Sequence, residues 1–181
     1  ITHDRIYKIM LFVTFVIAGI FLIINVIKLN LFGIISIGGS MLVFAGVLYY
    51  LKRNQVSVET KEFVTAIAIE LLIFIISMFS GASFSDDFIL FLAAIGVVGL
   101  YMEPKFTKVQ IIVALVLLAV MPVIHSDKME SLGQYILCYV MFAVASYLYY
   151  LTIRRGRAFI DIAREHTADS EKLLWAMQEM G

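Results

Sequence analysis

Residues 9–27 read IMLFVTFVIAGIFLIINVI, a stretch of nineteen residues without a charge. A helix of about 20 apolar residues crosses the hydrocarbon core of a bilayer, which is roughly 30 Å thick. The rest of the chain has the same character. Of its 181 residues, 62% are hydrophobic and 15% are charged, whereas soluble domains carry about 25% charged residues. We therefore expect an integral membrane protein.

Five further apolar runs follow the first, at 29–51, 63–79, 88–102, 109–124 and 132–153. The runs are continuous and not alternating, and backbone amides in hydrocarbon must be satisfied within their own segment, so each run is expected to be an α-helix. The sequence thus predicts an all-α membrane protein, a bundle of six transmembrane helices in three hairpins. Residues 1–153 are predicted to form this sensor or binding domain, and 154–181 a cytoplasmic signalling helix that continues the sixth span.

Basic residues gather on one side of the predicted bundle. Ten of the fourteen lie just before the first span, within four residues after the sixth, or between the second and third or the fourth and fifth. They are Arg5, Lys8, Lys52, Arg53, Lys61, Lys105, Lys108, Arg154, Arg155 and Arg157. Because Lys and Arg are retained on the cytoplasmic side, we expect a multi-pass protein with both termini in the cytoplasm.

The composition changes at Arg154, and the 28 residues from there to Gly181 include five bases and five acids. We expect one uninterrupted helix over 132–180. Its cytoplasmic part has residues spaced four and three apart, as in the seam of a coiled coil, so we expect a homodimer through this helix. The alternative, a helix lying on the membrane surface, is disfavoured by the acids on its polar face. The seam comprises Phe159, Ala163, His166, Ser170, Leu173, Met177 and Met180.

Three segments in the second half of the chain, LYMEPK (100–105), GQYIL (133–137) and YYLTIRRGRAFI (149–160), resemble the multi-span input region of bacterial methyl-accepting chemotaxis receptors. The resemblance implies a receptor of the bacterial inner membrane that passes its signal to a cytoplasmic signalling kinase. Signal transmission is expected through the seam and through the junction at Arg154, Arg155 and Gly156. Histidine kinases use similar membrane modules, so this output is an alternative. Since the helical pattern is still running at Gly181, we expect the chain to be the membrane part of a longer polypeptide.

Glu70 is the acid that lies deepest within a predicted span. It comes eight residues after Glu62, about 12 Å further into the membrane. An ionisable group at that depth costs at least about 2.5 kcal/mol, so it should face the bundle interior and find a polar partner. We expect either a ligand or proton site or a structural hydrogen bond. The candidate partners are Thr65, Ser77, Ser40 and Asn25.

The external loops contain a second candidate binding site. Carboxylates together with an imidazole can bind a divalent cation or a cationic ligand. The alternative is that these groups are ordinary solvated loop ends, and we assign no metal ion to them. The residues are Ser83, Asp86 and Asp87 in one loop and His125, Asp127 and Glu130 in the other.

Signatures of catalysis are absent from the sequence. It contains no HExxH motif, phosphate-binding loop or Ser–His–Asp arrangement, and its one cysteine, Cys138, has no second thiol for a disulfide. The net charge of zero argues against nucleic acid as a partner. We expect no enzyme activity and no cofactor. The leading interpretation is a membrane sensor of a small ligand or of a membrane property.

Two other functions remain open from the sequence. Six helices in about 150 residues also resemble the substrate-binding subunits of vitamin transporters, although the first span here lacks the alanine-rich face of that family. A purely structural membrane subunit is the second alternative. The fourth run has a face of small residues, Ala93, Gly96 and Gly99, that permits close approach of another helix.

Overall fold

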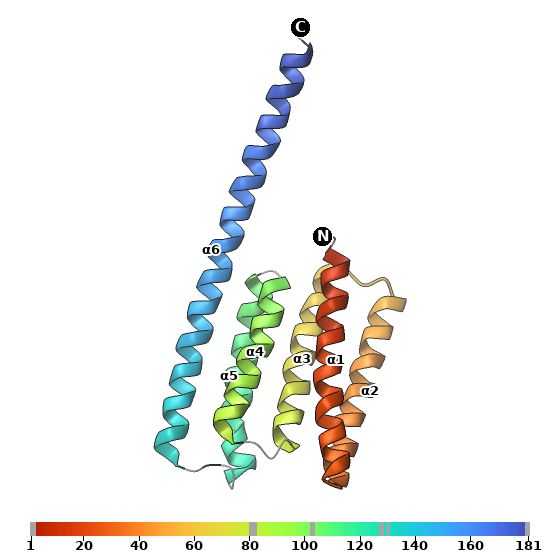
Figure 1. Ribbon diagram of the computed structural model, residues 1–181, viewed down its shortest axis with the longest axis vertical. Helices are drawn as coiled ribbons and strands as arrows, with labels where there is room; N and C mark the ends of the chain where they lie inside the picture. The colour runs from red at the N-terminus through yellow and green to blue at the C-terminus, as the bar shows by residue number, and fades with distance from the viewer. Residues whose placement is uncertain (1–2, 80–82, 102–103, 127–128, 130, 180–181) are drawn as a thin grey trace.

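The computed structural model describes residues 3–79, 83–101, 104–126, 129 and 131–179. Within these residues the chain forms six helices and no strand, so the prediction of an all-α protein is confirmed for them (Figure 1). The helices are α1 His3–Ile27, α2 Leu31–Arg53, α3 Val58–Phe79, α4 Phe84–Tyr101, α5 Pro104–Ile124 and α6 Leu132–Glu179.

Five of these helices are long and apolar enough to cross a membrane. They are α1 from Tyr7 onward, α2, α3, α5 and the part of α6 up to Thr167. Each contains one of the apolar runs found in the sequence, except that α2 begins two residues into the run 29–51. α4, which contains the run at 88–102 as far as Tyr101, is not among the five. The long apolar helices indicate an integral membrane protein.

Several helices begin before their apolar runs do. α3 starts at Val58, where the Ser57 hydroxyl accepts a hydrogen bond from the Thr60 N–H at 3.2 Å and caps the helix. α5 starts at Pro104, and proline fits the first position of a helix because its missing N–H has no acceptor there. Polar first turns of this kind extend a helix beyond what hydropathy detects.

A tight reversal over residues 28–30 joins α1 to α2. Leu29 has a positive φ of 53°, and the Asn30 side chain accepts a hydrogen bond from the Gly33 N–H at 3.1 Å. The Asn30 amide also donates to the Asn25 side-chain oxygen at 2.9 Å. A Cβ atom at Gly33 would clash with Asn25. Glycine is therefore required at this position for the two helix ends to approach so closely.

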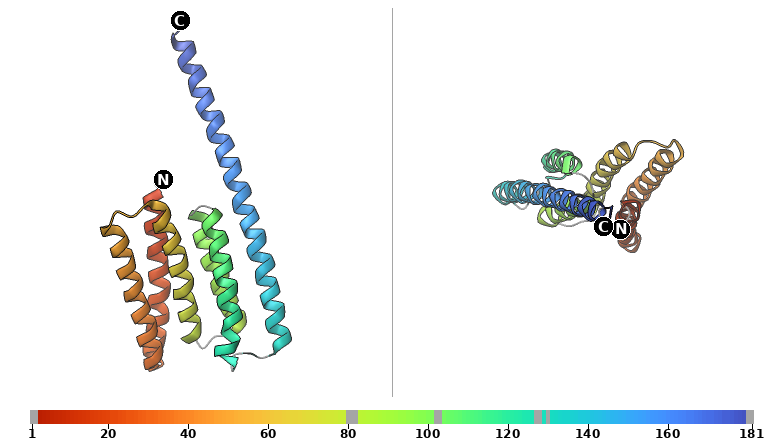
Figure 2. Two further views of the ribbon diagram at one scale, coloured as in Figure 1. Left: turned by 180° about the vertical axis from the view of Figure 1, so that it is seen from behind. Right: turned by 90° about the horizontal axis from the view of Figure 1, so that it is seen from above.

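α3 occupies the centre of the bundle. It contacts α1, α2, α4 and α5, and half of its apolar stretch is buried, compared with 17% for α2. Figure 2 shows α1 and α2 on one side of α3, and α4, α5 and α6 on the other. A polar side chain on the inner face of α3 is therefore surrounded by helices and not by lipid.

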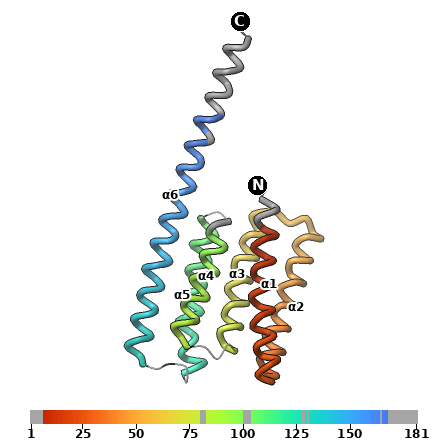
Figure 3. The backbone as a smooth tube through the Cα atoms, in the orientation of Figure 1, coloured from red at the N-terminus to blue at the C-terminus, as the bar shows by residue number. Residues whose placement is uncertain are grey.

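α6 is the longest helix, with 48 residues and a length of about 72 Å. Its first part packs against α4 and α5. The helix then continues past the ends of the other helices, on the side of the bundle where α1 begins (Figures 1 and 3). The prediction of an uninterrupted helix from residue 132 is confirmed as far as Glu179, and Gly156 does not interrupt it.

Candidate functional site

Glu70 lies near the middle of α3 and its side chain is fully buried, with 0% exposed. The expectation that it faces the bundle interior is confirmed. Neither carboxyl oxygen makes a hydrogen bond with a described residue. Because most buried polar groups in native proteins have hydrogen-bonding partners, an exception calls for an explanation. Glu70 is therefore the first candidate for a functional group in the bundle.

Gln110 of α5 faces Glu70 and is the amide placed to interact with it. Gln110 is also 0% exposed, and neither atom of its amide makes a standard hydrogen bond with a described residue. Thr107, one turn earlier on α5, also has a buried hydroxyl that makes no hydrogen bond with a described residue. A carboxyl and an amide together supply donors and acceptors inside an apolar bundle. This combination can bind a small polar group or hold a proton.

The partners that the sequence proposed for Glu70 are placed differently. The Thr65 hydroxyl shares a hydrogen bond of 2.9 Å with the Tyr7 hydroxyl. Ser40 and Asn25 each donate to a backbone carbonyl of the preceding turn, both at 2.9 Å. Ser77 is buried on α3 itself, seven residues further along the helix. The amide that faces Glu70 comes instead from α5, which carries none of these four residues.

Gln110 was not identified from the sequence. A signal for it exists, since Gln110 is the one amide side chain in the run 109–124. Amides inside a membrane span commonly make hydrogen bonds between helices. The pairing of α3 with α5 was the missing information, because no local pattern in either helix specifies its neighbour.

A small cavity lies between α3, α1 and α4. Its volume is about 50 Å³. The walls are apolar, including Ile69, Ile73 and Leu90, and the lining hydroxyl of Thr14 donates to a carbonyl of its own helix at 3.0 Å. This cavity offers no polar group to a ligand. The candidate site is therefore the α3–α5 pair and not this space.

Asp86 and Asp87 have different environments at the start of α4. The Asp86 carboxylate accepts hydrogen bonds from the Ser83 hydroxyl at 3.0 Å and from the Ser83 N–H at 3.3 Å, an arrangement that caps the helix. Asp87 is 0% exposed, although the sequence suggested that both acids belong to a solvated mouth. Asp86 therefore caps the start of α4, and Asp87 lies inside the bundle.

His125 follows the end of α5 and is half-buried. Its backbone N–H bonds the Met121 carbonyl at 2.9 Å, which continues the helical pattern by one residue. Asp127 and Glu130 lie outside the described residues. Within the described part of the chain, no group of three or more His, Cys, Asp or Glu residues is arranged to hold a metal ion. Ligand binding by His125 and Asp127 stays a prediction.

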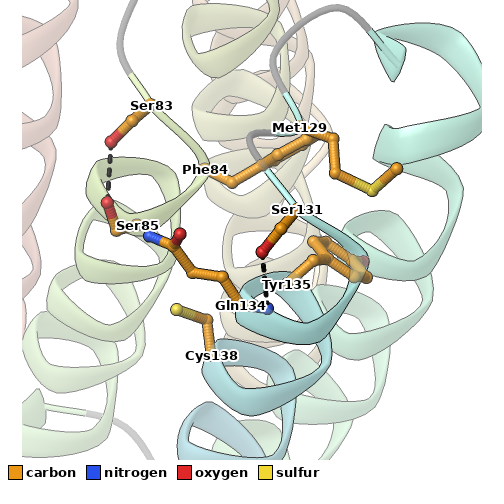
Figure 4. A pocket seen from close by; sticks show the side chains of 8 residues that line it. All are labelled: Ser83, Phe84, Ser85, Met129, Ser131, Gln134, Tyr135 and Cys138. Atoms are coloured by element: carbon orange, nitrogen blue, oxygen red, sulfur yellow. Dashed lines mark hydrogen bonds between the residues drawn. The ribbon is translucent and has the colours of Figure 1, made fainter.

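A shallow cleft separates the start of α4 from the start of α6 (Figure 4). The Ser83 and Ser85 hydroxyls share a hydrogen bond of 2.7 Å, and the Ser131 hydroxyl caps α6 by accepting from the Gln134 N–H at 3.1 Å. The Gln134 side chain extends toward Ser85, and Cys138 lies one turn below it. These contacts are local to the two helix starts, and neither Asp86 nor Asp87 is among the described residues that line the cleft.

Three tyrosines of α6 donate hydrogen bonds to backbone carbonyls of neighbouring helices. The Tyr149 hydroxyl bonds the Gly96 carbonyl of α4 at 2.6 Å, and the Tyr139 hydroxyl bonds the Leu115 carbonyl of α5 at 3.1 Å. Tyr135 donates to a second carbonyl of α5, three residues further along that helix. These bonds fix α6 both along its axis and about it. This role of the tyrosines was not predicted from the sequence.

Gly96 and Gly99 of the small-residue face of α4 lie against α6, whereas Ala93 lines the small cavity between α1, α3 and α4. A Cβ atom added at Gly99 would lie 2.8 Å from Cε1 of Tyr149, closer than real Cβ contacts, and would also clash with Ile153. Gly99 therefore permits α6 to pack close to α4. The sequence predicted a close approach of another helix at this position, and that helix is α6.

The junction residues lie where α6 passes the ends of its neighbours. Arg154, Arg155 and Gly156 are exposed there. Phe159 exposes 71% of its side chain. Ala163 and His166 are also exposed, whereas the side chains of Leu173 and Met177 lie outside the described part of the structure. Their proposed contacts with a second copy stay a prediction.

Comparisons of the chain with protein families, with curated proteins and with solved structures find no match. The proposals below therefore depend on the geometry of the helices and on the sequence patterns alone.

Proposed function

We propose that the chain is the sensor module of a membrane receptor and is embedded as six spanning helices. α4, with 18 residues, is about 27 Å long, close to the thickness of the hydrocarbon core. Small mismatch is accommodated by the bilayer, so α4 spans beside the other five helices. The ten basic residues on one side support an orientation with both termini in the cytoplasm.

The observation that carries this proposal is the continuity of α6. One helix of 48 residues contains both the segment that packs on α4 and α5 and the segment that extends past the bundle. A helix without a break moves as a unit, so a small shift or rotation at the bundle appears along the extension. Helix shifts of about 1–2 Å are a known form of transmission between sites.

The stimulus acts, in this proposal, at Glu70 and Gln110. These residues connect α3 with α5, and α5 in turn is bonded to α6 through Tyr139. A ligand group that binds the pair, or a proton gained or lost there, changes the preferred spacing of α3 and α5. The altered position of α5 then displaces α6.

The output is a change in a dimeric coiled coil formed by the extension of α6. The exposure of Phe159 and Ile162, at 71% and 52%, supports this proposal because an apolar surface on a solvated helix is stabilised by a second copy. By the resemblance stated above, the receptor is a chemotaxis-type transducer of the inner membrane that controls a cytoplasmic kinase. The input domain of a histidine kinase is the alternative with the same mechanics.

Disulfide cross-linking in native membranes tests the dimer. We expect Ala163→Cys, in a Cys138→Ser background, to form a covalent dimer rapidly under mild oxidation. Asp161→Cys is the matched control, since it is exposed on the same turn but lies off the seam. Equal rates at the two positions, or none at either, would contradict the predicted seam.

The rate of the same cross-link also reports whether a change at Glu70 reaches the extension of α6. Glu70→Gln keeps the size of the side chain and removes its charge, and we expect it to change the rate of cross-linking at position 163. Adding Gly156→Pro, which breaks the helix at the junction, should abolish that change, whereas Gly156→Ala should preserve it. A rate that does not respond to Glu70→Gln would remove the sensor role of the buried pair.

A further inference from the structure

A large cavity opens between α1, α2 and α3 at the end of the bundle where α1 begins. Its volume is about 760 Å³, within the range of roughly 300–1,000 Å³ typical of ligand sites. Leu11, Leu48 and Leu51 contribute apolar walls from α1 and α2. The cavity shares no lining residue with the Glu70 and Gln110 pair, so it is a separate site.

Three lysines line the same cavity, one from each helix: Lys8, Lys52 and Lys61. Lys61 is half-buried, and neither it nor Lys52 forms an ion pair with another described residue. One carboxyl group, that of Glu62, also lines the cavity and is 4% exposed. Among the described lining residues, three positive charges therefore accompany one negative charge, and this positive excess favours an anionic group.

The order of these groups along the membrane normal is informative. On α2, Leu48 and Leu51 belong to the apolar run 29–51 and Lys52 follows directly. The lysines therefore lie at the level of the lipid headgroups, and the leucines lie in the hydrocarbon. A phospholipid has the same arrangement, with a charged head above an apolar chain. Basic pockets between membrane helices on the cytoplasmic side bind anionic headgroups.

We propose that this cavity binds one anionic phospholipid from the cytoplasmic leaflet. Its phosphate lies among Lys8, Lys52 and Lys61, and an acyl chain lies along Leu11 and Leu48. A soluble phosphate compound has the same charged group but no acyl chain to contact the apolar wall. The inference goes beyond the sensor function and does not depend on it, because lipid binding is measured without reference to the extension of α6.

The test is native mass spectrometry of the protein in neutral detergent, titrated with dioleoyl phosphatidylglycerol or with dioleoyl phosphatidylcholine. We expect phosphatidylglycerol to bind more tightly than the zwitterionic lipid. The double variant Lys52→Gln/Lys61→Gln should bind it about 25-fold more weakly, since each lysine contributes about fivefold. The matched control is Lys105→Gln/Lys108→Gln. These lysines lie in the first turns of α5, at the same end of the bundle, but do not line the cavity. Equal losses in the two double variants would overturn the proposal.

A second variant separates the lipid from a soluble anion. Leu48→Trp fills the apolar part of the cavity and keeps all three lysines, so it should reduce phosphatidylglycerol binding. Inorganic phosphate should bind far more weakly than the lipid to the unmodified protein. Unchanged lipid binding in Leu48→Trp, or phosphate binding as tight as that of the lipid, would contradict lipid as the occupant. This variant also decides the question if the lysine variant does not fold.

Discussion

The Tyr149 hydroxyl of α6 donates a hydrogen bond of 2.6 Å to the Gly96 carbonyl oxygen of α4. Both residues lie within helices, and the tyrosine ring passes over the glycine face of α4, close to Gly99. A carbonyl in a helix can accept a second hydrogen bond because it has two lone pairs. The bond ties α6 to the bundle shortly before the helix leaves it, and the first prediction concerns its strength.

Replacing Tyr149 with Phe removes this bond and keeps the ring. We expect a loss of about 0.5–1.5 kcal/mol in the free energy of unfolding, the usual net value of one hydrogen bond. Unfolding in mixed detergent micelles measures it. Tyr147→Phe is the control, because Tyr147 is 59% exposed and lies on the same helix. Equal effects of the two variants would show that the Tyr149 bond does not hold α6.

Gly99→Val places a branched side chain where Tyr149 and Ile153 already lie. Overpacking of this kind costs roughly 1–3 kcal/mol, and we expect a lower midpoint of thermal unfolding. Gly46→Val is the matched control in α2, since no atom lies within 4 Å of a Cβ built there. If both valine variants unfold at the same temperature, α6 is not packed closely on α4 at Gly99.

Gln110→Leu removes the amide that faces the Glu70 carboxyl. The buried acid then loses the amide that faces it, and we expect destabilisation of roughly 1–3 kcal/mol. The double variant Glu70→Leu/Gln110→Leu should recover most of this loss, because replacing both polar partners by apolar groups is often nearly neutral. A double-mutant cycle of unfolding free energies measures the coupling. Strictly additive effects would mean that the two side chains do not interact.

Asp86→Ala removes the cap at the start of α4. We expect a loss of about 0.5–2 kcal/mol, as for other capping residues, whether or not divalent cations are present. Thermal unfolding with and without Ca²⁺ or Zn²⁺ checks this. Asp161→Ala, an exposed acid on the extension of α6, serves as the control. Stabilisation of the unmodified protein by a cation, lost in Asp86→Ala, would instead support a metal role for the external loop.

The sequence was sufficient to predict the helices, because each run of apolar residues satisfies its backbone within one segment. The burial of Glu70 also follows from the cost of exposing a carboxyl group to lipid. Helix ends were less well predicted. The turns capped by Ser57 and Ser83 are polar, and a hydropathy pattern ends before it reaches them.

The partners of individual side chains could not be predicted in the same way. Gln110 faces Glu70 because α5 packs on α3, and this pairing joins residues 40 positions apart in the sequence. Thr65 was a plausible partner by proximity on the same helix, yet its hydroxyl bonds Tyr7 on α1. Both outcomes depend on which helices are neighbours, and the apolar surfaces of membrane helices carry little information about that choice.

The central claim is that α6 connects the bundle to its extension as one rigid helix. Electron–electron double resonance tests it directly, with nitroxide labels at Val144 and Ile162 in a Cys138→Ser background. Both positions are exposed, and their separation of 18 residues corresponds to five full turns and about 27 Å. The labelled protein is diluted with unlabelled protein so that only distances within one chain contribute. The account predicts a single narrow distribution near that value, and a broad or clearly shorter distribution would contradict it.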